Sequence, residues 1–305
     1  MAALAFYIFV LPLSYLPMGF SYLLADLFYL ILITVFPYRK KIIDGNLKRS
    51  FPGLTPTEIL KLKRRFYRHF SDILIEGIKN LSISKRELKR RFTAKNPELM
   101  QELYAKNKSV ILVSGHYNNW EWLITSQSFL FPHKAYGIGM PMSSKFWDKK
   151  INSLRQRFGM KVIHSGNFKE AIEESDEPIA ILTLADQSPG DSNKSYWMNF
   201  LNQQSAILYG PEYMAIKYNM AVVGFIIRKV KRGHYEMELK LICDDPIKTK
   251  WGEITEEHIK MLETAIIEKP EQWIWSHKRW KRDLPTDMDK LRQEQYEKFK
   301  QLANR

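Results

Sequence analysis

The segment at residues 110–122 places the strictest limit on how this chain folds. Its first four residues, Val-Ile-Leu-Val, predict a buried strand, because they are apolar, mostly β-branched and too few for a buried helix. A Ser-Gly pair interrupts the run, and Asn118 and Asn119 are favourable N-cap residues for a helix that continues through Trp122. We therefore expect His116 in a tight turn between a rigid strand and the start of a helix.

Glu121 stands five positions after His116. Within one helix this offset corresponds to about 500° of rotation, which would point the two side chains well apart. They can meet only if His116 precedes the helix and Glu121 lies in its first turn. There Glu121 would accept a hydrogen bond from one imidazole nitrogen and leave the other nitrogen free to act as a base.

The spacing alone does not establish this pair. A second pair with the same spacing, His258 and Glu263, falls in a stretch with the pattern of an ordinary amphipathic helix. The alternative for His116 is a structural histidine held by hydrogen bonds. Its position between a strand, a glycine and a helix start is what favours a functional role.

Composition limits the class of protein. A hydrophobic fraction of 45% in 305 residues predicts a folded chain, as one large domain or two small ones. The single cysteine, Cys243, excludes a disulfide framework and a metal site built from several thiolates of one chain. The sequence contains no Gly-rich phosphate loop, no His-Glu-x-x-His helix and no Gly-x-Ser-x-Gly elbow. We predict neither a metal nor a cofactor.

The positive charge is concentrated in one segment. Of the net charge of +14, residues 39–95 carry +12, from 17 Lys and Arg against 5 Asp and Glu. Such a segment suits anionic lipid head groups, an acidic protein partner or nucleic acid. Nucleic acid is the weakest of these partners, because no RNA-binding motif occurs and the segment follows a membrane-like N-terminus. A solvated helical face would explain only part of the excess.

Residues 2–36 are apolar and aromatic and contain one charged residue, Asp26. The stretch exceeds the roughly 20 residues that span a bilayer, and it lacks the basic start and cleavage site of a signal peptide. Pro12 and Pro17 divide it, so a single span, a hairpin, an interfacial helix and a buried core helix all remain open. The basic cluster that follows would keep the rest of the chain on the cytoplasmic side. We predict that residues 1–38 attach the protein to a membrane.

The rest of the chain alternates between strand and helix patterns, which predicts an α/β fold with a central, mostly parallel sheet and helices on both faces. A capping box at residues 55–58 begins a long amphipathic helix in the basic segment 39–95. An α/β domain is expected over residues 96–285, and an exposed polar helix or tail over residues 286–305. Further strands are predicted at 135–140, 161–164, 179–184, 221–227 and 236–242, and helices at 145–158, 168–174 and 211–218.

Polar residues also follow two of these elements. Asp186 and Gln187 come after the apolar run at 179–185, where the carboxyl edge of an open α/β sheet binds ligands. Arg155 and Arg157 lie at the end of a predicted helix, and either arginine could bind an oxyanion or a phosphate. Taken alone, Asp186 could be a turn or cap residue, and each arginine a surface charge.

A late segment, residues 270–280, places three tryptophans among basic side chains. It could form an aromatic, basic wall that faces lipid head groups or an acyl chain. It could equally form a buried C-terminal element in which Arg279 stacks on an aromatic ring.

Together these motifs resemble the bacterial lipid A biosynthesis acyltransferases, the late lauroyl/myristoyl-type enzymes of the lysophospholipid acyltransferase superfamily. The resemblance extends over most of the chain, and the central and closing motifs are specific when they occur in this order. It implies a glycerol-3-phosphate acyltransferase-like fold. The matching segments are the apolar N-terminus with Phe-Pro-Tyr-Arg-Lys-Lys, Asn46-Leu-Lys-Arg-Ser-Phe51-Pro52, Gly115-His116-Tyr-Asn-Asn119-Trp120-Glu121, Arg157-Phe-Gly159, Asp186-Gln187-Ser-Pro-Gly190 and Pro270-Glu-Gln-Trp-Ile-Trp-Ser-His277-Lys-Arg279.

The resemblance implies transfer of a fatty acyl group from acyl carrier protein to a hydroxyl of a membrane lipid. For the lipid A enzymes this hydroxyl belongs to a 3-hydroxyacyl chain on a lipid A precursor. The expected location is the bacterial inner membrane, with the catalytic face in the cytoplasm. Another acceptor, such as a glycolipid, an aminolipid or an aryl polyene, stays open. So does a non-catalytic protein that binds anionic lipid at the membrane surface.

In this interpretation His116 is the general base and Glu121 orients it. Arg155 or Arg157 would stabilise the oxyanion or bind the donor. We predict that three further residues organise the site: Asn119, Asp186 and Gln187.

Overall fold

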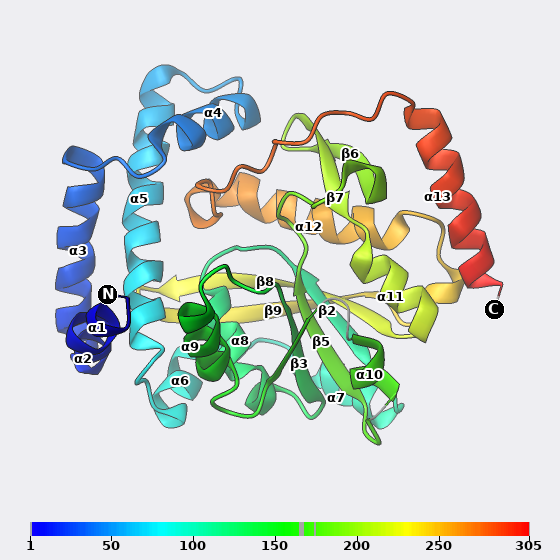
Figure 1. Ribbon diagram of the computed structural model, residues 1–305, viewed down its shortest axis with the longest axis horizontal. Coiled ribbons are helices and arrows are strands. Elements are labelled where there is room, and N and C mark those ends of the chain that lie inside the picture. Colours follow the sequence, from blue (N-terminus) through cyan, green and yellow to red (C-terminus); the bar gives the residue numbers. More distant parts are fainter. Residues whose placement is uncertain (1, 165–167, 174, 305) are drawn as a thin grey trace.

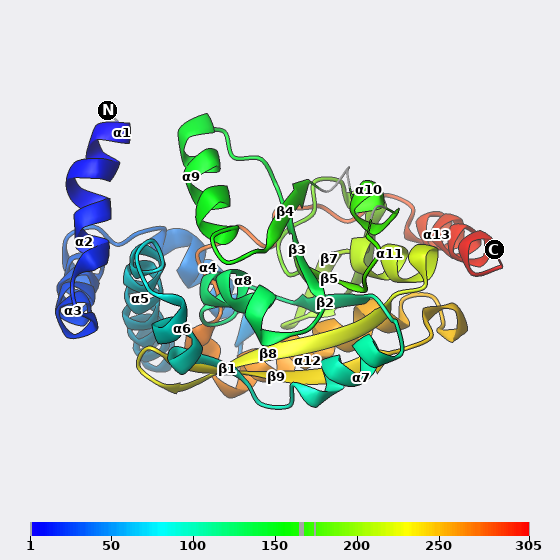
Figure 2. The ribbon, with the colours of Figure 1, turned by 90° about the horizontal axis from the view of Figure 1, so that it is seen from below.

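The computed structural model describes residues 2–164, 168–173 and 175–304. Its centre is a seven-stranded sheet with the strand order β1-β9-β8-β2-β5-β3-β4 (Figures 1 and 2; Figure 2 labels all of these strands). Neighbouring strands are parallel except for β8 and β9, which are antiparallel. The predicted α/β fold with a mostly parallel sheet is confirmed. The strands of this sheet are β1 (Phe92–Ala94), β2 (Val110–Ser114), β3 (Lys134–Gly139), β4 (Lys161–His164), β5 (Ile179–Leu184), β8 (Ala221–Lys231) and β9 (His234–Cys243).

Strand β2, the first part of the segment at residues 110–122, lies in the middle of the sheet. Val110 pairs with Ala180 of β5 on one side and with Ala221 of β8 on the other. All residues of β2 are buried, as expected for an interior parallel strand that is covered on both faces. Because β2 and β5 are parallel, with Ser114 opposite Leu184, their carboxyl ends lie side by side.

Helices cover both faces of the sheet, as predicted. Successive residues of a strand face opposite sides, so the even-numbered and odd-numbered residues of β2 belong to different parts of the core. Helices α7 (Glu98–Ala105) and α8 (Trp120–Leu130) pack on one face. Helices α11 (Gly210–Tyr218) and α12 (Glu253–Glu268) pack on the other (Figure 1). The remaining elements near the sheet are α9 (Lys145–Arg155), α10 (Phe168–Glu173) and the antiparallel hairpin of β6 (Ser195–Phe200) and β7 (Gln203–Leu208).

Helix α5 (Pro56–Lys79) begins at the predicted capping box. The Thr55 side chain accepts a hydrogen bond from the Glu58 backbone, and the Glu58 carboxylate accepts one from the Thr55 backbone. These two bonds satisfy backbone donors that a helix start otherwise leaves open. Shorter helices, α4 (Lys40–Ser50) and α6 (Lys85–Arg91), flank α5, so most of the basic segment is helical.

The N-terminal helices form a column beside α5, at the opposite end of the molecule from the last helix (Figures 1 and 2). Pro17 separates the last of them from the others. Over the described part of the chain, no helix is both long enough and apolar enough to cross a bilayer. Attachment of residues 1–38 to a membrane stays a prediction. The helices are α1 (Ala2–Ala5), a π-helical turn (Phe6–Val10), α2 (Leu11–Tyr15) and α3 (Met18–Thr34), and the last helix is α13 (Met288–Ala303).

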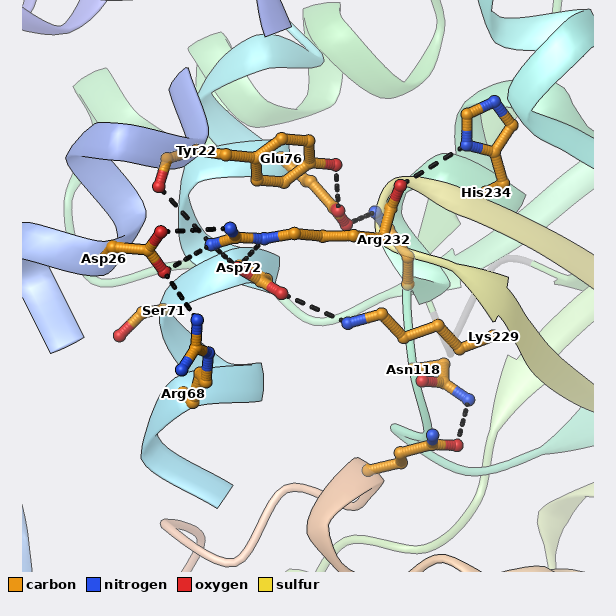
Figure 3. Close-up of polar contacts among 12 residues, drawn as sticks. Tyr22, Asp26, Arg68, Ser71, Asp72, Glu76, Asn118, Lys229, Arg232 and His234 are labelled. Atoms are coloured by element: carbon orange, nitrogen blue, oxygen red, sulfur yellow. Dashed lines mark hydrogen bonds and ion pairs between the residues drawn. The ribbon is translucent and has the colours of Figure 1, made fainter. Parts of the chain in front are cut away.

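Arg232, in the turn between β8 and β9, links α3 to α5 (Figure 3). Its guanidinium donates to Asp26 of α3 at 2.8 and 3.1 Å and to Asp72 of α5 at 2.7 and 2.9 Å. Lys229 supplies a second cation 3.1 Å from Asp72, which is 3% exposed. A carboxylate buried to this extent requires paired charge. Ion pairs therefore add to apolar packing in fixing the N-terminal helices to the body.

Candidate active site

His116 and Asp186 meet at the carboxyl edge of the sheet. The His116 Nδ1 atom lies 2.6 Å from Asp186 Oδ1, and the His116 backbone N–H donates to Asp186 Oδ2 at 2.9 Å. Burial acts to raise the pKa of Asp186, but the positive charge that His116 has when protonated and the hydrogen bonds from His116 and Trp273 hold that pKa at about 2. Asp186 is therefore an ionised carboxylate, and its contact with Nδ1 fixes the orientation of the imidazole ring.

The turn after β2 has the residue types that this contact requires. A Cβ atom at Gly115 would lie 2.7 Å from Asp186 Cγ and 2.5 Å from Leu262 Cδ2, so only glycine lets the carboxylate approach. Asn118 has a φ of 54°, in the left-handed region that asparagine tolerates. Asn119 caps α8 by accepting from the Trp122 backbone at 2.9 Å, which confirms the predicted N-cap.

Glu121 does not orient His116. Its carboxylate receives two hydrogen bonds from Arg155, Nε to Oε2 at 3.2 Å and Nη2 to Oε1 at 2.5 Å. Helix α8 begins at Trp120, so Glu121 points from its first turn toward α9, which carries Arg155. The predicted contact of Glu121 with the imidazole is wrong, and Asp186, from the neighbouring parallel strand, takes that position.

The two candidate arginines have different surroundings. Arg155 lies at the end of α9 and lines the cavity beside His116. Arg157 donates to the backbone carbonyls of Leu81 and Ile83, and its guanidinium lies 4.3 Å from the centre of the Phe158 ring. Of these two arginines, only Arg155 is among the described residues that line the cavity. Arg157 connects the segment after α5 to the end of α9.

The second ring nitrogen of His116 faces the cavity. With Nδ1 donating to Asp186, Nε2 carries the lone pair, and the Gln187 amide nitrogen lies 3.2 Å from it. The Trp120 ring packs at 71° to the imidazole, with 5.1 Å between the ring centres. This is the tautomer and the orientation that a general base needs.

The cavity has a volume of about 550 Å³ and lies at the carboxyl ends of β3 and β5. This is within the usual range of small-ligand sites. Its polar lining residues besides His116 are Arg155, Thr183, Gln187, Ser188 and Tyr213. The remainder is mainly glycine and apolar side chains: Trp120, Ile124, Gly137, Ile138, Gly139, Met140, Met160, Val162, Phe168, Leu182, Leu184, Pro189, Gly190, Leu208, Gly210, Pro211 and Met214. The arrangement can place an apolar chain next to a base.

The late tryptophan segment is a buried C-terminal element, one of its two predicted alternatives. Trp273 Nε1 donates to Asp186 Oδ2 at 2.8 Å, and both residues are buried. His277 Nε2 accepts from the Ser188 backbone at 3.1 Å, which fixes the loop after Asp186. The Arg279 guanidinium lies 5.8 Å from the centre of the Phe200 ring. This segment thus fixes Asp186 and the loop that follows it.

Glu76 is a further buried residue near the site that the sequence did not single out. Its carboxylate accepts from Asn119 Nδ2 at 2.6 Å and from the Tyr22 and Tyr235 hydroxyls, each at 2.7 Å. Burial raises the pKa of Glu76 to about 7, against the lowering effect of the tyrosine hydrogen bonds. Figure 3 shows Tyr22 of α3 reaching Glu76 on α5. Glu76 supports Asn119, the N-cap residue that follows the turn of His116.

The buried histidines His69 and His258 and the half-buried His277 make stability depend on pH. Burial lowers the pKa values of His69 and His258 to about 3 and that of His277 to about 4. Each is neutral when folded, whereas the unfolded chain takes up protons below pH 6.5. We expect the melting temperature to fall between pH 6.5 and 4, with roughly 3 kcal/mol lost per fully buried histidine at pH 4. His258→Leu should flatten the curve in circular dichroism melts, and an unchanged slope would contradict this expectation.

In the described residues, no group of three or more His, Cys, Asp or Glu side chains is arranged to hold a metal ion. The chemistry available at the site is that of a base, a fixed carboxylate and hydrogen-bond donors.

A mostly parallel α/β sheet with a His–Asp pair beside a largely apolar cavity is an arrangement that can transfer a proton to or from a substrate with an apolar chain. A family model described as bacterial lipid A biosynthesis acyltransferase matches residues 3–282. The chain belongs to this family of acyltransferases, which confirms the resemblance seen in the motifs. It is 22% identical over 246 residues to the lipid A biosynthesis lauroyltransferase of Escherichia coli (strain K12), covering 80% of this chain and 79% of that protein.

Proposed function

We propose that this protein transfers a fatty acyl group from the thioester of acyl carrier protein to a hydroxyl of a lipid A precursor. Family membership supports acyl transfer in lipid A synthesis. The observation that carries the chemistry is the His116 Nε2 lone pair, which faces an apolar cavity while Asp186 holds Nδ1.

In the proposed reaction, His116 Nε2 takes the proton of the acceptor hydroxyl as its oxygen attacks the thioester carbonyl carbon. Asp186 stabilises the imidazolium that forms, because its carboxylate stays ionised. The tetrahedral intermediate then expels the thiolate, and the imidazolium returns its proton to the sulfur. The C–S bond breaks and the ester C–O bond forms, so no acyl-enzyme and no cofactor are needed.

Two groups near His116 can stabilise the oxyanion of that intermediate. The Gln187 amide lies 3.2 Å from Nε2, so an incoming hydroxyl would displace it toward the carbonyl oxygen. Arg155 lines the same cavity and carries a positive charge. Glu121 holds its guanidinium with two hydrogen bonds, which limits its movement. Fixed donors of this kind lower the barrier because they need little reorganisation during the reaction.

The membrane attachment of this enzyme is also a proposal. Apolar side chains on the N-terminal helices are exposed, and the basic residues of α4 and α5 follow in the sequence. An apolar surface followed by positive charge suits the cytoplasmic face of an anionic inner membrane. The exposed apolar residues are Leu4, Tyr7, Ile8, Phe9, Leu13, Tyr15, Phe20, Leu23, Leu27, Leu30, Ile31, Val35, Phe36 and Tyr38.

The direct test uses purified protein in detergent, acyl carrier protein loaded with labelled fatty acids, and a tetra-acylated lipid A precursor. Label that moves into the precursor supports the proposal. Label released only as free fatty acid would retain the thioester chemistry and reject this acceptor. A total lipid extract would then be screened for another acceptor. No turnover with any donor or acceptor, while lipid binding persists, would reject the enzyme role.

Arg155 and Arg157 provide a matched pair for the oxyanion assignment. We expect Arg155→Met to lower kcat by about 100-fold, the usual effect of losing one oxyanion donor. Arg157→Met should leave kcat within about threefold and lower the melting temperature, because Arg157 hydrogen bonds only to backbone carbonyls among the described residues. Steady-state kinetics at saturating donor would decide. Equal losses of kcat in the two variants would contradict the assignment.

A further inference from the structure

One side of the cavity descends below the carboxyl edge of the sheet. Leu182 and Leu184 of β5 belong to the part of the core that faces α8, together with Ile124. On the neighbouring strand β3, the two cavity positions on this face are Gly137 and Gly139. Because glycine has no side chain, the strand leaves a hollow between α8 and the sheet.

The strand register gives the depth of this hollow. Leu184 pairs with Ser114, the last residue of β2 before the turn of His116, so it marks the upper layer. Leu182 pairs with Gly137 and lies two residues lower, about 7 Å further from the edge. A chain that enters at His116 passes Leu184 first and then reaches this second layer.

Met160 closes the second layer. It immediately precedes β4, is 2% exposed and lines the cavity. A Cβ atom added at Gly137 would lie 2.2 Å from Met160 Cε, so the thioether end lies directly over the bare backbone of the glycine. This flexible end is the floor of the hollow on the α8 side.

The opposite side of the cavity is more polar. It includes Thr183, Ser188 and Tyr213, together with Met214 of α11. An alkyl chain would leave these polar groups without partners, whereas the α8 side consists of apolar side chains and glycine. The α8 side is the better fit for the chain of the donor.

Resting on the proposed acyl transfer, we propose that Met160 and Gly137 set the length of the acyl chain that the enzyme accepts. The carbonyl end of the chain lies at His116, and its methyl end abuts the Met160 thioether. Shortening this side chain lengthens the hollow, and a side chain at Gly137 shortens it.

The test compares acyl carrier protein donors of graded chain length, from ten to sixteen carbons, by their kcat/KM ratios. Met160→Ala is expected to change the ratio of a longer to a shorter donor by about 10-fold in favour of the longer one, the usual scale for a methylene in an apolar pocket. Gly137→Ala is expected to shift the ratio in the opposite direction, because the new methyl group pushes the thioether end into the cavity. Met214 is a methionine on the other side of the same cavity. Met214→Ala should therefore leave the ranking of the donors by kcat/KM unchanged.

Folding and binding are measured beside turnover. Melting curves identify unfolded variants, and Met160→Val provides a smaller change with the same expected direction. Calorimetric binding of free fatty acids of the same lengths gives a readout that needs no acyl transfer. In one outcome, no donor is turned over but Met160→Ala still binds longer fatty acids in preference to shorter ones. This result would support the role of Met160 as the floor of the cavity and reject the proposed acyl transfer. A length preference that moves with Met214→Ala and not with Met160→Ala would overturn the inference.

Discussion

His116→Ala is expected to lower kcat by at least about 100-fold and by as much as about 10,000-fold. The variant loses the only ring nitrogen that faces the cavity with a lone pair among the described histidines, and general-base catalysis contributes on this scale. Donor binding should persist, because the other residues that line the cavity are unchanged. Turnover of acyl carrier protein donors and calorimetric binding of fatty acids measure the two effects separately.

His234→Ala is the control for this experiment. The His234 Nδ1 atom contacts the backbone carbonyl of Arg232, in the hairpin turn that holds the N-terminal helices (Figure 3). Its removal should leave kcat within about twofold. If His116→Ala kept more than a tenth of the wild-type kcat, His116 would be a structural histidine and the mechanism would need another base.

Asp186→Asn is expected to lower kcat by about 1,000-fold or more with little change in donor binding. The carboxylate accepts from Nδ1, and an asparagine amide placed there can donate to that nitrogen instead. The proton then moves to Nε2, the atom that must take the hydroxyl proton. In Ser-His-Asp sites the same reversal of the tautomer costs about 10,000-fold. A pH–rate profile and nitrogen NMR of the imidazole would report the change of tautomer directly.

Trp273→Phe separates this tautomer effect from general disturbance of the site. It removes the hydrogen bond from Nε1 to Asp186 Oδ2 and leaves the bond between Asp186 and His116 Nδ1 in place. We expect a loss of kcat of roughly 10-fold, in line with one hydrogen bond to a charged group. If Asp186→Asn and Trp273→Phe had equal effects, Asp186 would only pack the site.

Local sequence patterns predicted the secondary structure correctly where residues close together in the chain determine it. The β-branched run before Ser114 predicted the central strand, and the Thr55 capping box predicted the start of α5. The apolar run at 179–185 placed Asp186 at the carboxyl edge, and the strand β5 ends there. Each of these features depends on side-chain type and spacing within a few residues.

The partner of His116 could not be predicted in this way. Glu121 is close in the sequence, but the start of α8 turns it toward Arg155. Asp186 reaches the imidazole because β2 and β5 pair in parallel register, a contact between residues 70 positions apart. Trp273 contacts Asp186 across 87 positions and Glu76 contacts Asn119 across 43 positions, and no local pattern predicts either contact. Helix and strand patterns do not encode which strands become neighbours.

The contact of Trp273 with Asp186 also bears on when this enzyme first becomes active in the cell. Asn118, two residues after His116, donates a hydrogen bond to Gln272, which lies 154 positions later in the chain. A nascent chain that has already formed β2, α8 and β5 would still lack both of these late supports. Contacts of such high sequence separation form slowly, because a long loop must close first. Catalytic competence is therefore expected only once translation has passed the last tryptophans, when the N-terminal helices have long been available to a membrane.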